Sequence, residues 1–372
     1  MGAGFAFDHV GVRNFRLQWR FYGPPAGHPQ AAGIRAAPFD AAHPARTNAD
    51  TSVLADVYYD VEIGRGWLAV SNTSTAVYAP GNPAKSSLVW VDHGGTTQSL
   101  GVDQGAYREV TLSPDGTKAA VRHGGGDAWI HDLQRGTSSL LTPAHHISFW
   151  PLWSSDGTRI IFASNRGGDW DIYSQPADGS RPAEALLSLP HDQFPTSVLA
   201  DGTVLYHEIN PRTGFDLWTL APGSPSQEGT TSPLRVTPFN ERDAEVSPGP
   251  EGGPRWVTYT STESGRSEIY VQSYPSGANR MPVSTGGGIL PRWSRDGSEL
   301  FYVTGDAIVA VAIRADGPFG APRRLFDRTN FFTRRFRSYD TSPDGKRFLM
   351  IQRDSGSVPR QLNVILNWAD EH

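Results

Sequence analysis

Residues 152–164 read Leu152-Trp153-Ser154-Ser155-Asp156-Gly157-Thr158-Arg159-Ile160-Ile161-Phe162-Ala163-Ser164, and Asp171-Ile172-Tyr173 follow after a short polar stretch. Apolar residues stand on both sides of the Asp156-Gly157 pair. Because glycine accepts the positive φ of a tight turn, an Asp-Gly pair between two apolar runs predicts a β-hairpin. The stretch therefore predicts a strand, a tight turn, a second strand and, at Asp171–Tyr173, a third.

The same turn recurs along the chain, with Asp-Gly pairs at Asp115, Asp156, Asp296 and Asp344 and a weaker copy at Asp201. The copies follow one another at intervals of about 40 to 50 residues if the stretch from Asp201 to Asp296 holds two units. A degenerate copy at 244–249 fills that stretch. A period of this length, built of about four strands, is typical of a β-propeller blade.

The repeats predict an all-β fold: a single closed β-propeller of four-stranded blades, with seven blades favoured and six or eight as alternatives. First strands are expected near Tyr59, Tyr107, Phe149, Pro195, Ala244, Leu290 and Ser338. A divergent first unit is expected over 58–92. The last unit has expected strands at 338–341, 347–351 and 361–368 but no fourth strand, so an N-terminal strand at 51–55 is expected to complete the ring. Residues 1–50 are expected to form an irregular segment or partial blade, and 51–372 the propeller.

Composition narrows the class of protein. The 372 residues include 40 Gly and 29 Pro, which suits many short strands joined by turns. There is no cysteine, which excludes disulfides, thiolate metal sites and a cysteine nucleophile. The net charge of −5, without a basic block, gives no nucleic-acid footprint. We see no signal peptide and no apolar run of membrane-spanning length, and expect a soluble cytoplasmic protein.

The repeated Trp-Ser-x-Asp-Gly and Ser-Pro-Asp-Gly turns, with strands such as Asp171-Ile172-Tyr173 after them, resemble TolB-like β-propeller repeats over about residues 55–368. Residues 264–271, 284–294 and 344–350 resemble the propeller region attached to some bacterial serine/threonine kinases, although the kinase motifs are absent from the sequence. The resemblance implies a binding module that holds a protein or peptide partner on its top face.

Propeller geometry sorts the polar residues. The first strand of each blade lines the central channel, so the Asp-Gly turns are expected at the bottom and the loops between second and third strands at the top. The turn aspartates Asp115, Asp156, Asp296 and Asp344 are expected to cap their own turns. Positions two residues before the motif serine are expected deeper in the channel: Thr111, Leu152, Glu245, Arg292 and Asp340. Four channel residues are candidates for catalysis: Asp243, Glu245, Arg292 and Asp340. Five residues around the upper opening are candidates for substrate binding: Glu109, Arg166, His191, Arg337 and Tyr339.

A divalent metal is a further candidate. His145, His146 and Asp243 offer imidazole nitrogen and carboxylate oxygen, which suit Zn²⁺ or Mn²⁺, whereas a shell mostly of oxygen suits Ca²⁺. Such an ion would polarise an ester oxygen and lower the pKa of bound water. The alternative is that the two histidines belong to a solvated loop, because adjacent side chains point in different directions.

Two functions follow from these residues. One is a hydrolase of ester, lactone or phosphotriester bonds, with Asp243 or Glu245 as base. The other is a binding propeller, in which Glu245, Arg292 and Asp340 form a salt-bridged ring that offsets the burial of their charges. The expected partner is a small-molecule substrate in the first case and a protein or peptide in the second, with no role for nucleic acid or membrane.

Overall fold

The protein is described from a computed structural model. The structure describes residues 11–12, 15–18, 34–38, 51–54, 59–60, 65–66, 68–71, 75–80, 85–123, 126–142, 147–223, 229–248, 256–313, 319–331, 337–354 and 361–366. Every described element is a strand, which confirms the all-β prediction. No helix in this part of the chain is long and apolar enough to cross a membrane.

Contacts divide the chain into two units. Unit 1 comprises Met1–Ser86 and Arg353–His372, and unit 2 comprises Ser87–Gln352. The sequence-based division at residue 50, with 51–372 as the propeller, stays a prediction. Seven four-stranded sheets are present in the described residues, the number expected. Six of them belong to unit 2 and one to unit 1.

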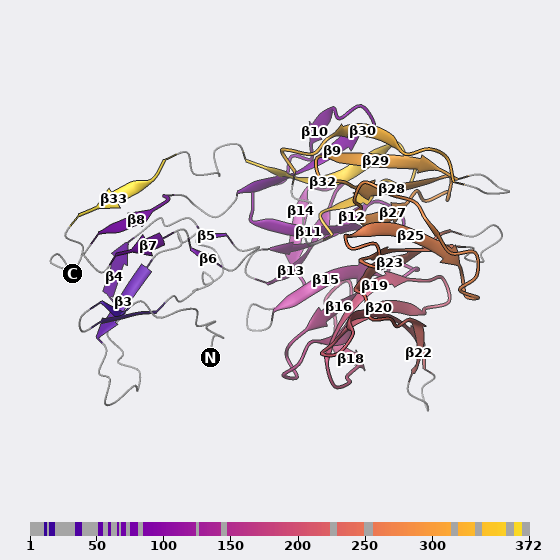
Figure 1. The fold of residues 1–372 in the computed structure, drawn as a ribbon, viewed down its shortest axis with the longest axis horizontal. Helices are drawn as coiled ribbons and strands as arrows, with labels where there is room; N and C mark the ends of the chain where they lie inside the picture. Colours follow the sequence, from indigo (N-terminus) through magenta and orange to yellow (C-terminus); the bar gives the residue numbers. More distant parts are fainter. Residues whose placement is uncertain are drawn as a thin grey trace. The chain divides into compact units, whose positions relative to one another are not determined.

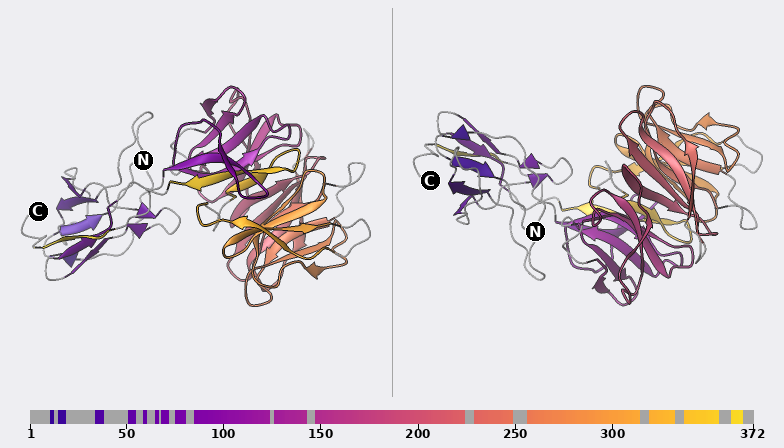
Figure 2. Two further views of the ribbon diagram at one scale, coloured as in Figure 1. Left: turned by 90° about the horizontal axis from the view of Figure 1, so that it is seen from above. Right: turned by 90° about the horizontal axis from the view of Figure 1, so that it is seen from below.

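Unit 2 contains six four-stranded sheets, and in five of them the strands are antiparallel and follow chain order (Figures 1 and 2). From first to fourth strand, three of them are β11 (Tyr107–Leu112), β12 (Lys118–His123), β13 (Ala128–Asp132), β14 (Thr137–Leu140); β15 (Ser148–Trp153), β16 (Arg159–Ser164), β17 (Asp171–Pro176), β18 (Glu184–Leu187); and β19 (Asp192–Val198), β20 (Val204–Asn210), β21 (Gly214–Ala221), β22 (Thr230–Arg235). The others are β23 (Glu241–Val246), β24 (Trp256–Ser261), β25 (Glu268–Ser273), β26 (Met281–Pro282); β27 (Ile289–Trp293), β28 (Glu299–Val303), β29 (Ala307–Ala312), β30 (Arg323–Asp327); and β31 (Tyr339–Thr341), β32 (Arg347–Arg353), β9 (Ser86–Asp92), β10 (Thr97–Ser99).

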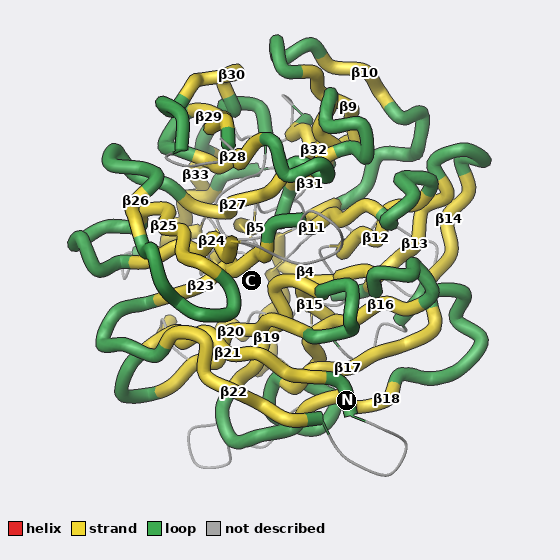
Figure 3. Tube along the Cα trace, turned by 90° about the vertical axis from the view of Figure 1, so that its right-hand side faces the viewer, coloured by secondary structure: helices red, strands yellow, loops and turns green. Residues whose placement is uncertain are grey.

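The last of these sheets joins the two ends of the propeller segment. Strands β31 and β32 pair onward with β9 and β10, which precede the first repeat. N-terminal strands therefore do complete the last sheet, but they are β9 and β10 and not the strand at 51–55. In Figure 3 the first strands β11, β15, β19, β23, β27 and β31 lie nearest the centre of unit 2, and the fourth strands lie outermost. Each first strand contacts its two neighbours around this centre.

Unit 1 holds the remaining strands. Its four-stranded sheet contains β1 (Gly11–Val12), β2 (Phe15–Gln18), β3 (Ile34–Pro38) and β4 (Thr51–Leu54). Its smaller sheets pair β5 (Tyr59–Asp60) with β6 (Arg65–Gly66), and β8 (Ala76–Tyr78) with both β7 (Leu68–Val70) and β33 (Asn363–Ile365). The expected first blade at 58–92 is therefore divided: β5 to β8 lie in these small sheets, whereas β9 and β10 lie in the last propeller sheet. The expected last strand at 361–368 does not extend that sheet, because β33 pairs with β8 and not with β32.

The Asp-Gly turns explain why the repeats fold alike. In the four strong copies the serine hydroxyl donates to the turn aspartate, as Ser154 does to Asp156 at 2.5 Å, and the amide two residues on donates to the same carboxylate. The glycine adopts a positive φ, 70° at Gly157. These bonds lower the pKa of Asp156, chiefly through the hydroxyl of Ser154. The turn aspartates therefore hold the bottom loops in shape, as the sequence predicts.

Apolar side chains pack between successive sheets and not within one central core. One cluster joins the β11–β14 sheet to the β15–β18 sheet through Ile130, Trp153 and Phe162, and equivalent clusters join the following pairs. The motif tryptophans also link blades by hydrogen bonds. Trp153 Nε1 donates to the carbonyl of Thr111 at 3.1 Å, and Trp293 Nε1 donates to that of Glu245 at 3.2 Å.

Candidate functional site

A cavity of about 450 Å³ lies at the bottom end of the channel. All six first strands, or the turns that follow them, contribute to its wall. Its apolar wall comes mainly from Leu112, Leu152, Trp153, Val246 and Trp293, and its mouth carries the exposed residues Ser155, Ala200 and Arg295. The volume suits a small ligand or the side chains of a short segment. The cavity lies at the Asp-Gly turns, whereas the functional residues were expected mainly at the top.

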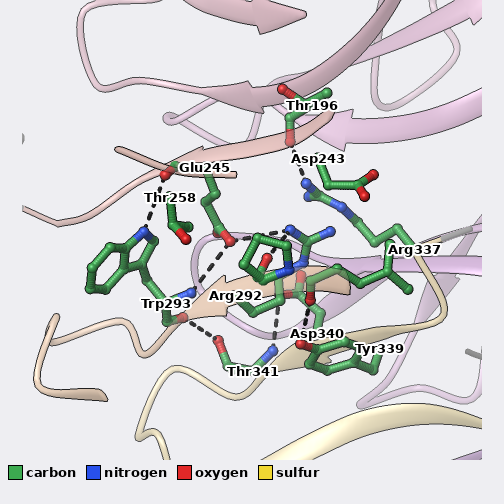
Figure 4. Close-up of polar contacts among 12 residues, drawn as sticks. Thr196, Asp243, Glu245, Thr258, Arg292, Trp293, Arg337, Tyr339, Asp340 and Thr341 are labelled. Carbon is green, nitrogen blue, oxygen red and sulfur yellow. Dashed lines mark hydrogen bonds and ion pairs between the residues drawn. The ribbon is translucent and has the colours of Figure 1, made fainter. Parts of the chain in front are cut away.

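The Glu245 carboxylate binds two groups of β27 in the channel (Figure 4). Its Oε2 accepts from Arg292 Nη1 at 3.2 Å and from the backbone amide of Trp293 at 3.3 Å. Arg292 is only 2% exposed and also donates to the carbonyl of Pro291. Burial by itself would lower the pKa of Arg292, but the nearby carboxylates, Glu245 first, outweigh burial and raise it. The Glu245 carboxylate therefore keeps a buried arginine charged and fastens β23 to β27.

Asp340 makes the same kind of connection between the last and first sheets. Its Oδ2 accepts from the amide of Leu112 at 2.8 Å, and its Oδ1 accepts from the amide of Thr341 at 2.9 Å. The amide of Val110 also donates to the carbonyl of Arg337, at 2.8 Å. Both oxygens of Asp340 are thus occupied by backbone amides, and these bonds join β31 to β11.

Arg337 differs from Arg292 in its partners. It is 8% exposed and lines the cavity, and its Nη2 donates to the carbonyl of Thr196 (Figure 4). Within the described residues, no carboxylate lies at ion-pair distance from its guanidinium, and its buried Nε has no hydrogen-bond partner. Burial, and then repulsion by Arg292, lower the pKa of Arg337 to about 10. This arginine stays charged at neutral pH while lacking a direct counter-ion in the described part of the chain.

Near the top of the channel, Glu109 is fully buried and tightly paired. Its Oε2 accepts from the amide of Trp150 at 2.6 Å, and its Oε1 lies 3.1 Å from Arg122 Nε. Burial raises the pKa of Glu109, and the Arg122 guanidinium opposes that change. Glu109 does not line the cavity, and it repeats the carboxylate-to-next-blade contact of Glu245 and Asp340.

The other predicted residues lie apart from the cavity. Arg166 is half-buried and stacks on Tyr173, with its guanidinium carbon 4.6 Å from the ring centre. His191 is exposed. Tyr339 is buried, and its hydroxyl donates to the carbonyl of Leu290 at 2.6 Å. Asp243 Oδ2 accepts from the Thr260 hydroxyl at 3.3 Å. The structure thus brings Glu245, Arg337 and Asp340 together at the cavity, with Arg292 directly behind Glu245.

Asp243 has a backbone conformation that the repeat explains. Its φ is 58°, and the equivalent residues Trp150 and Leu290 have φ values of 52° and 53°. Each stands where the register between first and second strands shifts. Positive φ is strained for tryptophan and leucine. Because three blades share this bulge, the conformation of Asp243 reflects blade construction and not a special role of one aspartate.

The predicted metal ligands are only partly described. His145 and His146 lie outside the described residues, so only Asp243 of that set can be placed. In the described part of the chain, no group of three His, Asp or Glu residues is arranged to hold a metal ion. Because two of its three ligands lie outside the described residues, the metal site stays a prediction.

Sequence reasoning identified the channel position of each repeat but missed most of the cavity wall. Thr111, Leu152, Glu245 and Asp340, expected in the channel, all line the cavity. Arg295 and Ala200 were missed because they belong to the bottom turns, which were assigned a purely structural role. The available signal was the arginine between serine and aspartate in Ser294-Arg295-Asp296, where the other strong copies carry serine or proline.

Comparisons with known proteins agree with this architecture. No protein-family model matches the chain. A candidate TolB from Agrobacterium tumefaciens superposes with a TM-score of 0.57 at 18% identity, covering 73% of this chain and 99% of that one. TolB from Acinetobacter baumannii gives 0.49 at 15% identity, covering 77% and 68%. A gluconolactonase from Xanthomonas campestris gives 0.48 at 14% identity, covering 74% and 98%. The TolB-like propeller suspected from the repeat motifs is confirmed as the fold of this chain.

Proposed function

We propose that the propeller unit binds a protein or peptide partner, which inserts a short segment into the bottom cavity. The observation that supports this proposal is the position of the cavity, on the channel axis and within reach of all six first strands. A segment bound there contacts every blade at once, with apolar walls around it and exposed residues at the mouth. Most binding sites of this kind are largely preformed concavities with a few polar groups.

The carboxylates nominated for catalysis favour binding over hydrolysis. A general base needs an oxygen free to reach the proton that it removes. Both Asp340 oxygens accept from backbone amides, so Asp340 has no such oxygen, and Glu245 Oε2 accepts from Arg292 and an amide, which leaves Glu245 with Oε1 alone outside these bonds. These contacts support the salt-bridged-ring hypothesis for the channel charges, in which pairing compensates for burial.

The test uses two tryptophan substitutions in one blade. Ser155→Trp places a bulky side chain at the exposed cavity mouth, and Ser180→Trp places one on an exposed turn that does not line the cavity. Immobilised wild-type protein is used to capture a stoichiometric partner from extracts of the source cells. We expect Ser155→Trp to lose that partner at least about tenfold, or 1.4 kcal/mol, and Ser180→Trp to retain it. Equal capture by both variants would count against the cavity.

The hydrolase alternative is tested on the same preparations. p-Nitrophenyl esters and a phosphotriester are offered before and after chelator treatment. Turnover that disappears in Asp243→Ala, Glu245→Ala or Asp340→Ala would overturn the binding proposal in favour of hydrolysis. Turnover unaffected by these variants would place any activity elsewhere.

A further inference from the structure

We propose that the bottom cavity is a carboxylate-binding site, in which the Arg337 guanidinium receives the single negative charge of a ligand with an apolar body. This inference rests on the proposed function in that it names the chemistry of the segment inserted there.

The acidic groups of the wall are satisfied by the protein itself. Glu245 is paired with Arg292 and a backbone amide, and Asp340 accepts from two amides. Asp201 accepts from the amide of Thr203 at 2.9 Å in its own turn. Each of these three carboxylates therefore already accepts at least one hydrogen bond from the protein itself.

The basic groups of the wall are not satisfied in this way. Arg337, which is more than nine-tenths buried, has no carboxylate at ion-pair distance in the described part of the chain, and its Nε lacks a partner there. Arg295 at the mouth forms no ion pair with any described residue, and its Nη2 reaches only the carbonyl of Leu112, at 3.4 Å. The nearest carboxylates, Glu245, Asp340 and Asp243, raise the pKa of Arg337 only from beyond ion-pair distance and do not outweigh its burial. A carboxylate bound in direct contact would offset more of the cost of burying this charge.

The same wall indicates which anion fits. A guanidinium matches a carboxylate in a planar, two-bond geometry. Glu245 and Asp340 also line the cavity, so a doubly charged phosphate would be repelled more strongly than a single negative charge. Leu112, Leu152 and Trp153 supply apolar surface for the remainder of the ligand. A peptide carboxylate next to an apolar residue meets these requirements.

Isothermal titration calorimetry tests the inference with three matched probes: 4-phenylbutyrate, its neutral amide and phenyl phosphate. We expect the carboxylate to bind at least about tenfold more tightly than the amide, because a charge-assisted hydrogen bond is lost with the charge. We also expect it to bind more tightly than the phosphate ester. Arg337→Gln should abolish the preference for carboxylate over amide, and Arg295→Gln, an exposed position that should leave folding unchanged, should reduce it.

Crystals of the wild-type protein soaked in iodide provide a measurement that needs no variant. An anomalous peak beside the Arg337 guanidinium is expected. Equal binding of acid and amide, tighter binding of the phosphate ester, failure of all three probes to bind, or absence of the iodide peak would each overturn the carboxylate site. The partner-binding proposal is judged separately, because it depends on whether Ser155→Trp loses the captured partner while Ser180→Trp keeps it.

Discussion

Two of the buried arginines of the propeller unit, Arg122 and Arg337, lie in contrasting settings. Near the top, Arg122 faces the fully buried Glu109 at 3.1 Å, and Glu109 in turn accepts an amide from the next blade. At the bottom cavity, Arg337 donates to a carbonyl but has no carboxylate at ion-pair distance in the described part of the chain. Burial lowers the pKa of both arginines. Both arginines are therefore buried charges, and they differ in whether a carboxylate lies at ion-pair distance.

The largest expected effect comes from breaking the top pair. Glu109→Ala leaves the buried Arg122 without its carboxylate, so we expect the free energy of unfolding to fall by about 3–5 kcal/mol. Urea denaturation followed by tryptophan fluorescence measures this loss. The double variant Glu109→Gln/Arg122→Met removes both charges and should lose less. A single variant as stable as the wild type would show that the top pair does not hold the blades together.

Asp340 tests whether cavity carboxylates also act structurally. Asp340→Ala deprives the amides of Leu112 and Thr341 of their acceptor, and we expect a loss of about 1–3 kcal/mol. Asp340→Asn keeps one acceptor oxygen and should lose less, as measured by the same denaturation curves. If the alanine variant loses no stability, Asp340 is free to act on a ligand, and the contrast between top and bottom weakens.

Removing an aspartate of a bottom turn should lower the free energy of unfolding by less than removing Glu109 or Asp340. Asp296→Ala removes the acceptor for the Ser294 hydroxyl and the Ser298 amide, and we expect a loss of about 1 kcal/mol because the turn is exposed. Thermal unfolding measures it. Asp344→Ala at the equivalent turn is the matched control and should behave alike. A much larger loss at Asp296 alone would mean that this turn has a role beyond its own loop.

These turns also predict a pH dependence. The pKa of Asp115, Asp156, Asp296 and Asp344 is lowered, chiefly by a serine hydroxyl in each case. A lowered pKa in the folded state gives stability that is present above the unfolded-state pKa and lost as pH falls through the folded value. The free energy of unfolding should therefore decline below about pH 4. In Asp296→Ala the decline should be shallower, and an unchanged slope would contradict the assignment.

The smallest effect on stability is expected at the cavity mouth. Arg295 is exposed and makes one long hydrogen bond, so Arg295→Gln should change the free energy of unfolding by less than about 0.5 kcal/mol. Denaturation curves that superpose on those of the wild type would meet this expectation. A substantial loss would make Arg295 a structural residue, like Arg122 and unlike the proposed ligand contact.

Much of the fold was predictable because each blade is formed by strands that follow one another closely in the sequence. An Asp-Gly turn between apolar runs defines a hairpin from a few adjacent residues, and its recurrence fixes the spacing of the sheets. The pairing of distant strands was less predictable. Nothing in the local pattern of 51–55 or of 86–92 shows which of them joins β32, because both contain a short apolar run of the kind that a buried strand carries. The assignment of 361–368 was wrong for the same reason.

The site was predictable only in part. Spacing from the motif serine places Glu245 and Asp340 in the channel, but spacing does not show which partner neutralises each charge. Arg292 forms an ion pair with Glu245, whereas no described carboxylate lies at ion-pair distance from Arg337. This difference depends on the directions of side chains on neighbouring blades. The sequence therefore indicated a ring of charges, and the structure distinguishes those that are paired from the one that is not.

The pairing of β8 with β33 has a consequence for the order of folding. Tyr78 and Asn363, which meet across these strands, are 285 residues apart. Joining them in an unfolded chain costs more entropy than joining them after β9 and β32 have paired, which shortens the free loop to about 20 residues and lowers the closure cost by about 2 kcal/mol. During synthesis on a ribosome, β8 is made long before β33 and cannot pair with it until β33 has been made. We therefore expect the propeller sheets to fold first and the pairing of β8 with β33 to follow.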